Sequence, residues 1–160
     1  MESLKLRNLK RPASIFLCAG IIFGVAALIV YLLTGVNEFN PELSPAVIGF
    51  LIAAMVLGAC MLVLRLLGID QVAYLKPHFN LFGYGAYLLA LFAFMYYASS
   101  QVNYVVNVIV AIDGTTISAA FVLTMAFLLL TFAAFLVSAI MLGRENLAPK
   151  GEIVYENERV

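Results

Sequence analysis

The segment from Ile117 to Gly143, ISAAFVLTMAFLLLTFAAFLVSAIMLG, decides the fold of this chain, because no charged residue interrupts it. A helix that rises about 1.5 Å per residue needs roughly 20 apolar residues to cross a hydrocarbon core of about 30 Å. The segment exceeds that length. We therefore expect it to cross a membrane as a helix.

Three similar charge-free runs precede this segment, at Ala13 to Asn37, Leu43 to Leu64 and Phe79 to Ile112. The chain of 160 residues is 64% hydrophobic and 11% charged, with a mean hydropathy of +1.05. These values lie far outside the range of soluble domains. We therefore predict an all-α integral membrane protein built as an antiparallel bundle of four transmembrane helices.

The charge-free runs also predict how the chain is divided. A basic N-terminus (residues 1–12) and a polar C-terminal tail (143–160) flank a membrane domain at 13–142. Within the membrane domain we expect spans near 13–34, 45–66, 79–99 and 117–142, outer loops at 35–44 and 100–116, and an inner loop at 67–78.

The basic residues predict the orientation. All nine Lys and Arg lie in the N-terminal tail, around the connection between the second and third spans, or in the C-terminal tail, whereas the other two loops carry only Glu38, Glu42 and Asp113. Cytoplasmic loops accumulate Lys and Arg. We therefore expect both termini in the cytoplasm and a location in the cell membrane, plasma or inner.

Small and hydroxyl-bearing residues mark the expected contacts between helices. Gly20 and Gly24 form a Gly-x-x-x-Gly pair, which permits close helix approach, although glycine is common in membrane helices generally. A hydroxyl recurs every seven residues in the last span, and this stripe is more typical of a packing seam than of a polar conduit. The candidate packing residues are Gly20, Gly24, Gly49, Ala53, Gly58, Gly83, Thr124, Thr131 and Ser138.

The outer segment 100–114 includes the run VNYVVNVIVAIDG at 102–114, which is rich in β-branched residues and ends in an Asp-Gly turn signal. This composition favours an extended, β-like segment, although a helix extending the third span would place Ser100, Asn103 and Asn107 on one face. A strand would expose an edge for pairing with another chain. We expect its interaction residues to be Asn103, Tyr104, Val105, Asn107 and Asp113.

Several chemistries lack their usual residues. No ionisable side chain lies in the middle of a span, which argues against a self-sufficient proton-coupled transporter. The sequence contains no Cys-x-x-Cys pair, no His-Glu-x-x-His motif, no nucleotide-binding glycine loop and no credible Ser-His-Asp set. We therefore expect no catalytic residue, cofactor or metal, and the net charge of zero argues against nucleic acid as a partner.

These observations favour a non-catalytic multi-pass membrane subunit that contacts lipid and assembles with itself or with a larger, transporter-type membrane complex. The alternative is an oligomeric pore or facilitator for ions or small solutes, lined by Thr124, Thr131 and Ser138 or by Asn103 and Asn107. A weaker alternative is a small-ligand sensor or an enzyme accessory.

Overall fold

The computed structural model describes residues 11–36, 42–69, 76–110 and 116–147, and these contain helices but no strand. The helices are α2 (Pro12–Thr34), α3 (Pro45–Leu66), α4 (Lys76–Ser100), α5 (Val102–Ile109) and α6 (Ala119–Leu147). Four stretches are long and apolar enough to cross a membrane: α2, α3, Leu81–Ser100 of α4 and Ala119–Glu145 of α6. The prediction of a helical membrane protein with four such segments is confirmed.

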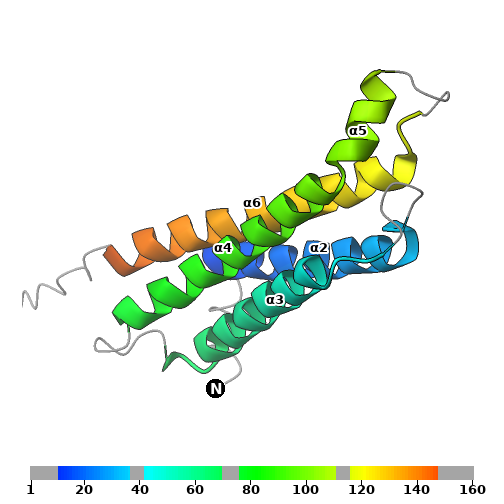
Figure 1. The fold of residues 1–160 in the computed structure, drawn as a ribbon. Coiled ribbons are helices and arrows are strands. Elements are labelled where there is room, and N and C mark those ends of the chain that lie inside the picture. Colours follow the sequence, from blue (N-terminus) through cyan, green and yellow to red (C-terminus); the bar gives the residue numbers. More distant parts are fainter. Residues whose placement is uncertain (1–10, 37–41, 70–75, 111–115, 148–160) are drawn as a thin grey trace, which may run out of the picture.

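The four long helices run up and down in sequence and form a closed ring (Figure 1). α2 packs against α3 and α6, and α4 packs against the same two helices from the other side. We call one end of this bundle the Arg65 end; it holds the start of α2 and the last turns of α3 and α6. The opposite end, where α5 turns away from the bundle, is the Tyr104 end (Figure 1).

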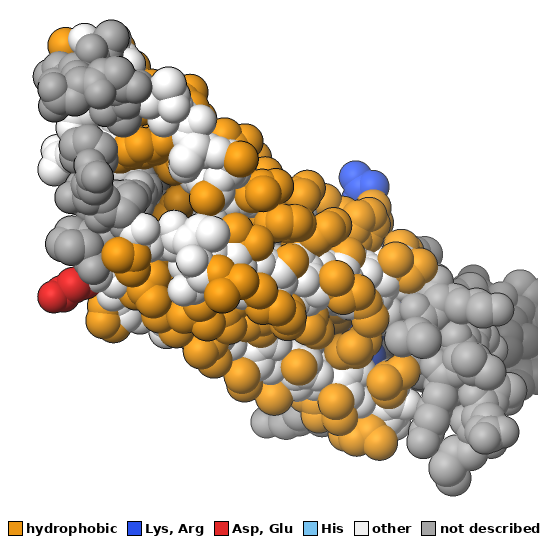
Figure 2. Space-filling model, turned by 90° about the vertical axis from the view of Figure 1, so that its right-hand side faces the viewer, with side chains coloured by type: hydrophobic (Ala, Val, Ile, Leu, Met, Phe, Trp, Pro, Cys, Tyr) orange, Lys and Arg blue, Asp and Glu red, His pale blue; other side chains and the backbone are white. Residues whose placement is uncertain are grey.

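The outer surface of the bundle is apolar. Large hydrophobic side chains are exposed on every long helix, including Ile22 on α2, Val56 on α3, Phe92 on α4 and Leu129 on α6. Figure 2 shows hydrophobic side chains covering most of the visible face, with an acidic side chain at one end and a basic side chain projecting nearer the other. Such a surface suits hydrocarbon, because lipid tails are as apolar as these side chains.

In the interior of the bundle, large side chains of one helix pack directly against glycines of its neighbours. Phe135 of α6 is 1% exposed and lies against Gly20 of α2 and Gly58 of α3. A Cβ atom added at Gly20 would stand 2.8 Å from the Phe135 ring, and one added at Gly58 would stand 2.7 Å from it. Real Cβ atoms do not approach that closely, so the ring occupies a notch that exists because both residues are glycine.

The expectation of an extended outer segment is wrong, because Val102–Ile109 forms helix α5. The chain turns at Gln101 (φ −96°, ψ 4°) and then becomes helical again, with Val105 N–H donating to the Gln101 carbonyl. A lone strand would leave its backbone groups without partners, whereas a helix pairs them internally. This local requirement outweighs the β-propensity of the valines, which depends strongly on context.

Candidate functional site

The Arg65 end contains an ion pair between a buried guanidinium and a carboxylate that is 24% exposed. Arg65 Nη2 of α3 donates to Glu145 Oε2 of α6 over 2.5 Å, and the Arg65 side chain is fully buried. The other carboxylate oxygen, Oε1, accepts a hydrogen bond from the Ala13 backbone N–H at the start of α2, with an N···O distance of 3.4 Å. One carboxylate therefore joins three helices at the same end of the bundle.

The ion pair was not predicted from the sequence, because Glu145 was expected to lie in the tail that begins at residue 143. In the structure α6 continues to Leu147, so Glu145 lies in its last turns. A signal was present in the sequence: Arg65 and Glu145 each follow an apolar run that ends at the same predicted side of the membrane.

The hydroxyl stripe of α6 faces the interior of the bundle. Thr124, Thr131 and Ser138 are all buried. The Thr124 hydroxyl donates to the Ala120 carbonyl over 2.9 Å, and Thr131 donates to the Phe127 carbonyl over 2.7 Å, each within α6. Ser138 instead donates to the Ala13 carbonyl of α2 over 2.9 Å. Thr124 also hydrogen-bonds the Tyr97 side chain of α4, so the stripe links α6 to both α2 and α4 and presents none of its hydroxyls on the outer surface.

Most of the candidate small residues lie at contacts between helices. Beyond Gly20 and Gly58, a Cβ at Gly24 would stand 2.8 Å from Met55 of α3, and one at Gly83 would stand 3.4 Å from Leu142 of α6. Gly49 is different. A Cβ atom added there would meet no other atom within 4 Å, so this glycine is open on the surface of α3.

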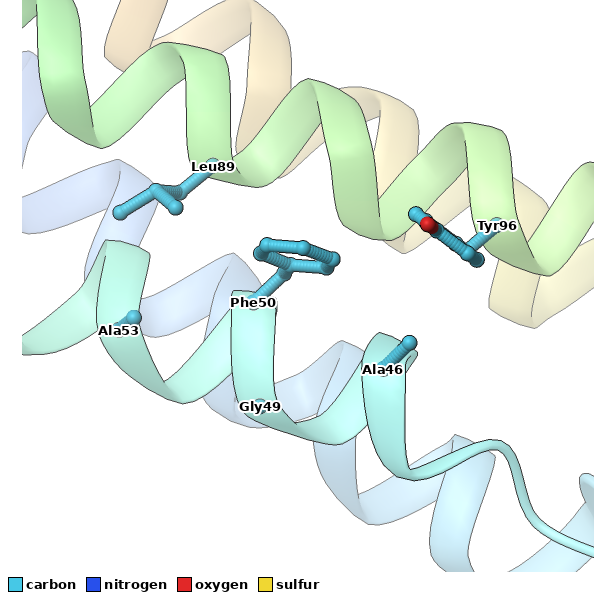
Figure 3. A pocket seen from close by; sticks show the side chains of 6 residues that line it. All are labelled: Ala46, Gly49, Phe50, Ala53, Leu89 and Tyr96. Carbon is cyan, nitrogen blue, oxygen red and sulfur yellow. The ribbon is translucent and has the colours of Figure 1, made fainter.

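Gly49 belongs to an apolar groove of about 430 Å³ between α3 and α4. Figure 3 shows Phe50 and Tyr96 extending from α3 and α4 into the space between these helices, while Ala46, Gly49 and Ala53 follow one another along α3. The Phe50 and Tyr96 ring centroids are 5.5 Å apart. The complete lining is Ala46, Gly49, Phe50, Ala53, Leu89 and Tyr96. Two rings therefore stand beside a strip of three small residues.

The expected interaction residues of the outer segment take different positions on α5. Tyr104 is buried, Asn103 is exposed, and Val105 and Asn107 are half-buried. The Tyr104 hydroxyl donates to the Thr116 carbonyl over 2.8 Å and accepts from the Ser118 N–H over 2.6 Å. Tyr104 thus ties α5 to the start of α6 and is not available on the surface. Asp113 lies outside the described residues.

Within the described residues, no group of three or more His, Cys, Asp and Glu is placed to hold a metal ion. The two cysteines, Cys18 and Cys60, are both free thiols. Comparison with protein-family models, with curated proteins and with solved structures gives no significant match. The geometry of the α3–α4 groove makes it the candidate site for binding a partner.

Proposed function

We propose that the protein is a non-catalytic multi-pass membrane subunit, and that it assembles with a second copy or with a larger membrane complex through the α3–α4 groove. The observation that carries this proposal is the open strip at Gly49. Gly58 on the same helix receives the Phe135 ring, whereas Gly49 meets nothing and, unlike the equally open Gly143 of α6, lies in the lining of an apolar groove.

An open glycine strip suits a partner helix, because small residues let two helix backbones approach closely in lipid. Association of membrane helices depends on van der Waals packing, since lipid competes equally for apolar surface. The aromatic rings of Phe50 and Tyr96 project beside this strip, next to the hollow of the α3–α4 groove. A surface that combines both features can also match itself across a two-fold axis, as a homodimer requires.

The proposed orientation follows the basic residues, with both termini and the Arg65 end in the cytoplasm of the cell membrane. The Tyr104 end, including α5, then faces outward. The pore alternative has less support, because the hydroxyls of Thr124, Thr131 and Ser138 lie inside the bundle and are hydrogen-bonded to carbonyls. A conduit between copies that is lined by these three hydroxyls would need them on the outer surface of the bundle.

The test compares Gly49→Phe with Ile52→Phe. Neither change should disturb the bundle, because Gly49 has open space beyond its Cα and Ile52 is exposed on the same helix outside the groove. Förster transfer between labelled copies in liposomes measures self-association, and native gels of gently solubilised membranes show larger complexes. We expect Gly49→Phe to weaken association and Ile52→Phe to leave it unchanged.

Two results would overturn the proposal. One is a wild-type protein that stays monomeric across lipid dilutions and migrates alone on native gels. The other is an association that tolerates Gly49→Phe, which would place the contact elsewhere. Solute or ion flux through liposomes that contain only this protein would favour the pore alternative.

A further inference from the structure

Helix α5 has one apolar face and one polar face. At 100° per residue, Val102, Val105, Val106 and Ile109 fall within an arc of about 100°, and Val110 extends that arc at the C-cap. Asn103, Tyr104 and Asn107 lie on the remaining side, together with the half-buried Val108. The apolar face is largely uncovered by the chain, with Ile109 being 76% exposed. No charged residue occurs in this helix.

Tyr104 fixes the rotation of α5 about its own axis. Its hydroxyl bridges the Thr116 carbonyl and the Ser118 N–H, and its ring packs edge-on against Phe121 of α6, with centroids 5.4 Å apart. Tyr104 is about 160° around the helix from Val102 and Val106. The side of α5 that is anchored to Thr116 and Ser118 is therefore the polar one, opposite Val102 and Val106.

The position of α5 along the bundle matches the boundary of a membrane. The apolar stretch of α4 ends at Ser100, and α5 begins two residues later at Val102. The eight-residue helix is about 12 Å long. The headgroup layer on each side of a bilayer is about 5 to 7 Å thick. Because α5 turns away from the bundle axis (Figure 1), it rises less than its full length above the end of α4.

An apolar groove of about 290 Å³ runs along this face of α5. It is shared with the bundle, because Ala98 of α4 and Phe121 and Met125 of α6 complete its lining with Val102, Val105 and Val106. Met95 of α4 and Val122 of α6, each within one turn of a lining residue, are also exposed. Whatever covers the membrane-crossing faces of α4 and α6 therefore extends into this groove.

We propose that α5 lies in the interface of the leaflet at the Tyr104 end, with its apolar face immersed among lipid acyl chains and one chain seated in the groove. This contact requires only hydrocarbon. The described part of α5 and the groove lining carry no Lys or Arg that would select an anionic headgroup. The arrangement follows the general behaviour of interfacial amphipathic helices, whose apolar face enters the boundary between headgroups and acyl chains. The proposal is independent of the α3–α4 contact.

The absence of tryptophan from the chain makes the test direct, because each introduced Trp is the sole reporter. Val102→Trp and Asn103→Trp are matched: the two residues are adjacent, both are exposed, and they lie on the apolar and polar faces respectively. Each full-length variant is placed in phosphatidylcholine liposomes with or without acyl-brominated lipid, which quenches Trp fluorescence on contact. Ile109→Trp, at the most exposed position of the face, serves as a second reporter.

We expect brominated lipid to quench Val102→Trp and Ile109→Trp several-fold more than Asn103→Trp, and aqueous acrylamide to give the opposite order. Quenching of Ile109→Trp and Val102→Trp by acrylamide but not by brominated lipid would overturn the proposal, because the face would then lie in water. Protection from both quenchers would also overturn it, since another protein surface would then cover the face.

Discussion

Arg65 and Glu145, 80 positions apart in the sequence, form an ion pair that joins α3 to α6, and Glu145 also accepts a hydrogen bond from the start of α2. Arg65 in the last turn of α3 and the carboxylate at a first-turn N–H of α2 agree with the dipoles of those two helices, whereas Glu145 in the last turn of α6 opposes the dipole of its own helix. A buried charge is costly without a partner, so the pair makes the relative placement of three helix ends specific.

Glu145→Gln should destabilise the protein by about 1 to 3 kcal/mol, because the buried Arg65 guanidinium loses the charge of a carboxylate that is itself partly exposed. The measurement is reversible unfolding by SDS in mixed micelles. The double variant Arg65→Met/Glu145→Leu should recover most of that loss, since removing both charges of a buried pair is often close to neutral.

Arg144→Gln is the matched control for this pair, because Arg144 is adjacent to Glu145 but exposed. We expect a change within about 0.5 kcal/mol for this variant. Equal losses for Glu145→Gln and Arg144→Gln would show that the buried pair contributes nothing particular to stability.

Substitution by alanine should change the stability of the protein in opposite directions at the two glycines of α3. Gly49→Ala should raise stability by up to about 1 kcal/mol, because alanine is the better helix former and its Cβ meets no atom within 4 Å. Gly58→Ala should lower it by about 1 to 3 kcal/mol, because its Cβ would overlap the buried Phe135 ring.

The same SDS titration measures both alanine variants. Adding Phe135→Leu to Gly58→Ala should make the second substitution less costly than it is alone, as expected for residues that share one packing space. An additive effect of the two substitutions would contradict the notch seen in the structure.

The number and class of the long helices could be predicted from the sequence, because charge-free runs such as 117–143 leave a chain few alternatives in lipid. The state of residues 102–109 could not. Val105 and Val106 favour a strand by composition, but the choice depends on whether a second strand is present to pair with the first. Composition of one segment carries no information about that partner.

The sequence suggests a set of small packing residues, but it does not show the position that each one takes in the bundle. Gly49 and Gly58 both belong to small-residue patterns on the same helix, yet one is open and the other receives Phe135. The difference depends on which face of α3 meets α6, and this is a property of the assembled bundle. The Arg65–Glu145 pair was missed for a related reason, because it required the end of α6 to be placed beyond residue 142.

Tyr104→Phe should loosen α5 while leaving the long helices intact. The substitution removes the hydroxyl that bridges the Thr116 carbonyl and the Ser118 N–H, at a cost of about 1 to 3 kcal/mol when a buried polar group loses its partner. Hydrogen exchange measured by mass spectrometry should show faster exchange across residues 102–110. Tyr96→Phe is the control, because the Tyr96 side chain is exposed in the α3–α4 groove. Unchanged protection of 102–110 in Tyr104→Phe would mean that the hydroxyl does not anchor α5.

Thr131→Val and Ser138→Ala compare a buried hydroxyl that bonds within α6 with one that bonds from α6 to α2. Thr131 donates to the Phe127 carbonyl of its own helix, which already takes part in the helix backbone, so valine of similar shape should change stability by less than about 0.5 kcal/mol. Ser138 donates across to Ala13 of α2, and interhelical bonds of this kind contribute about 0.6 kcal/mol on average. Ser138→Ala should therefore be the more destabilising of the two in SDS unfolding. The reverse order, or a change in liposome flux with Thr131→Val, would indicate that Thr131 serves a pathway and would return weight to the pore alternative.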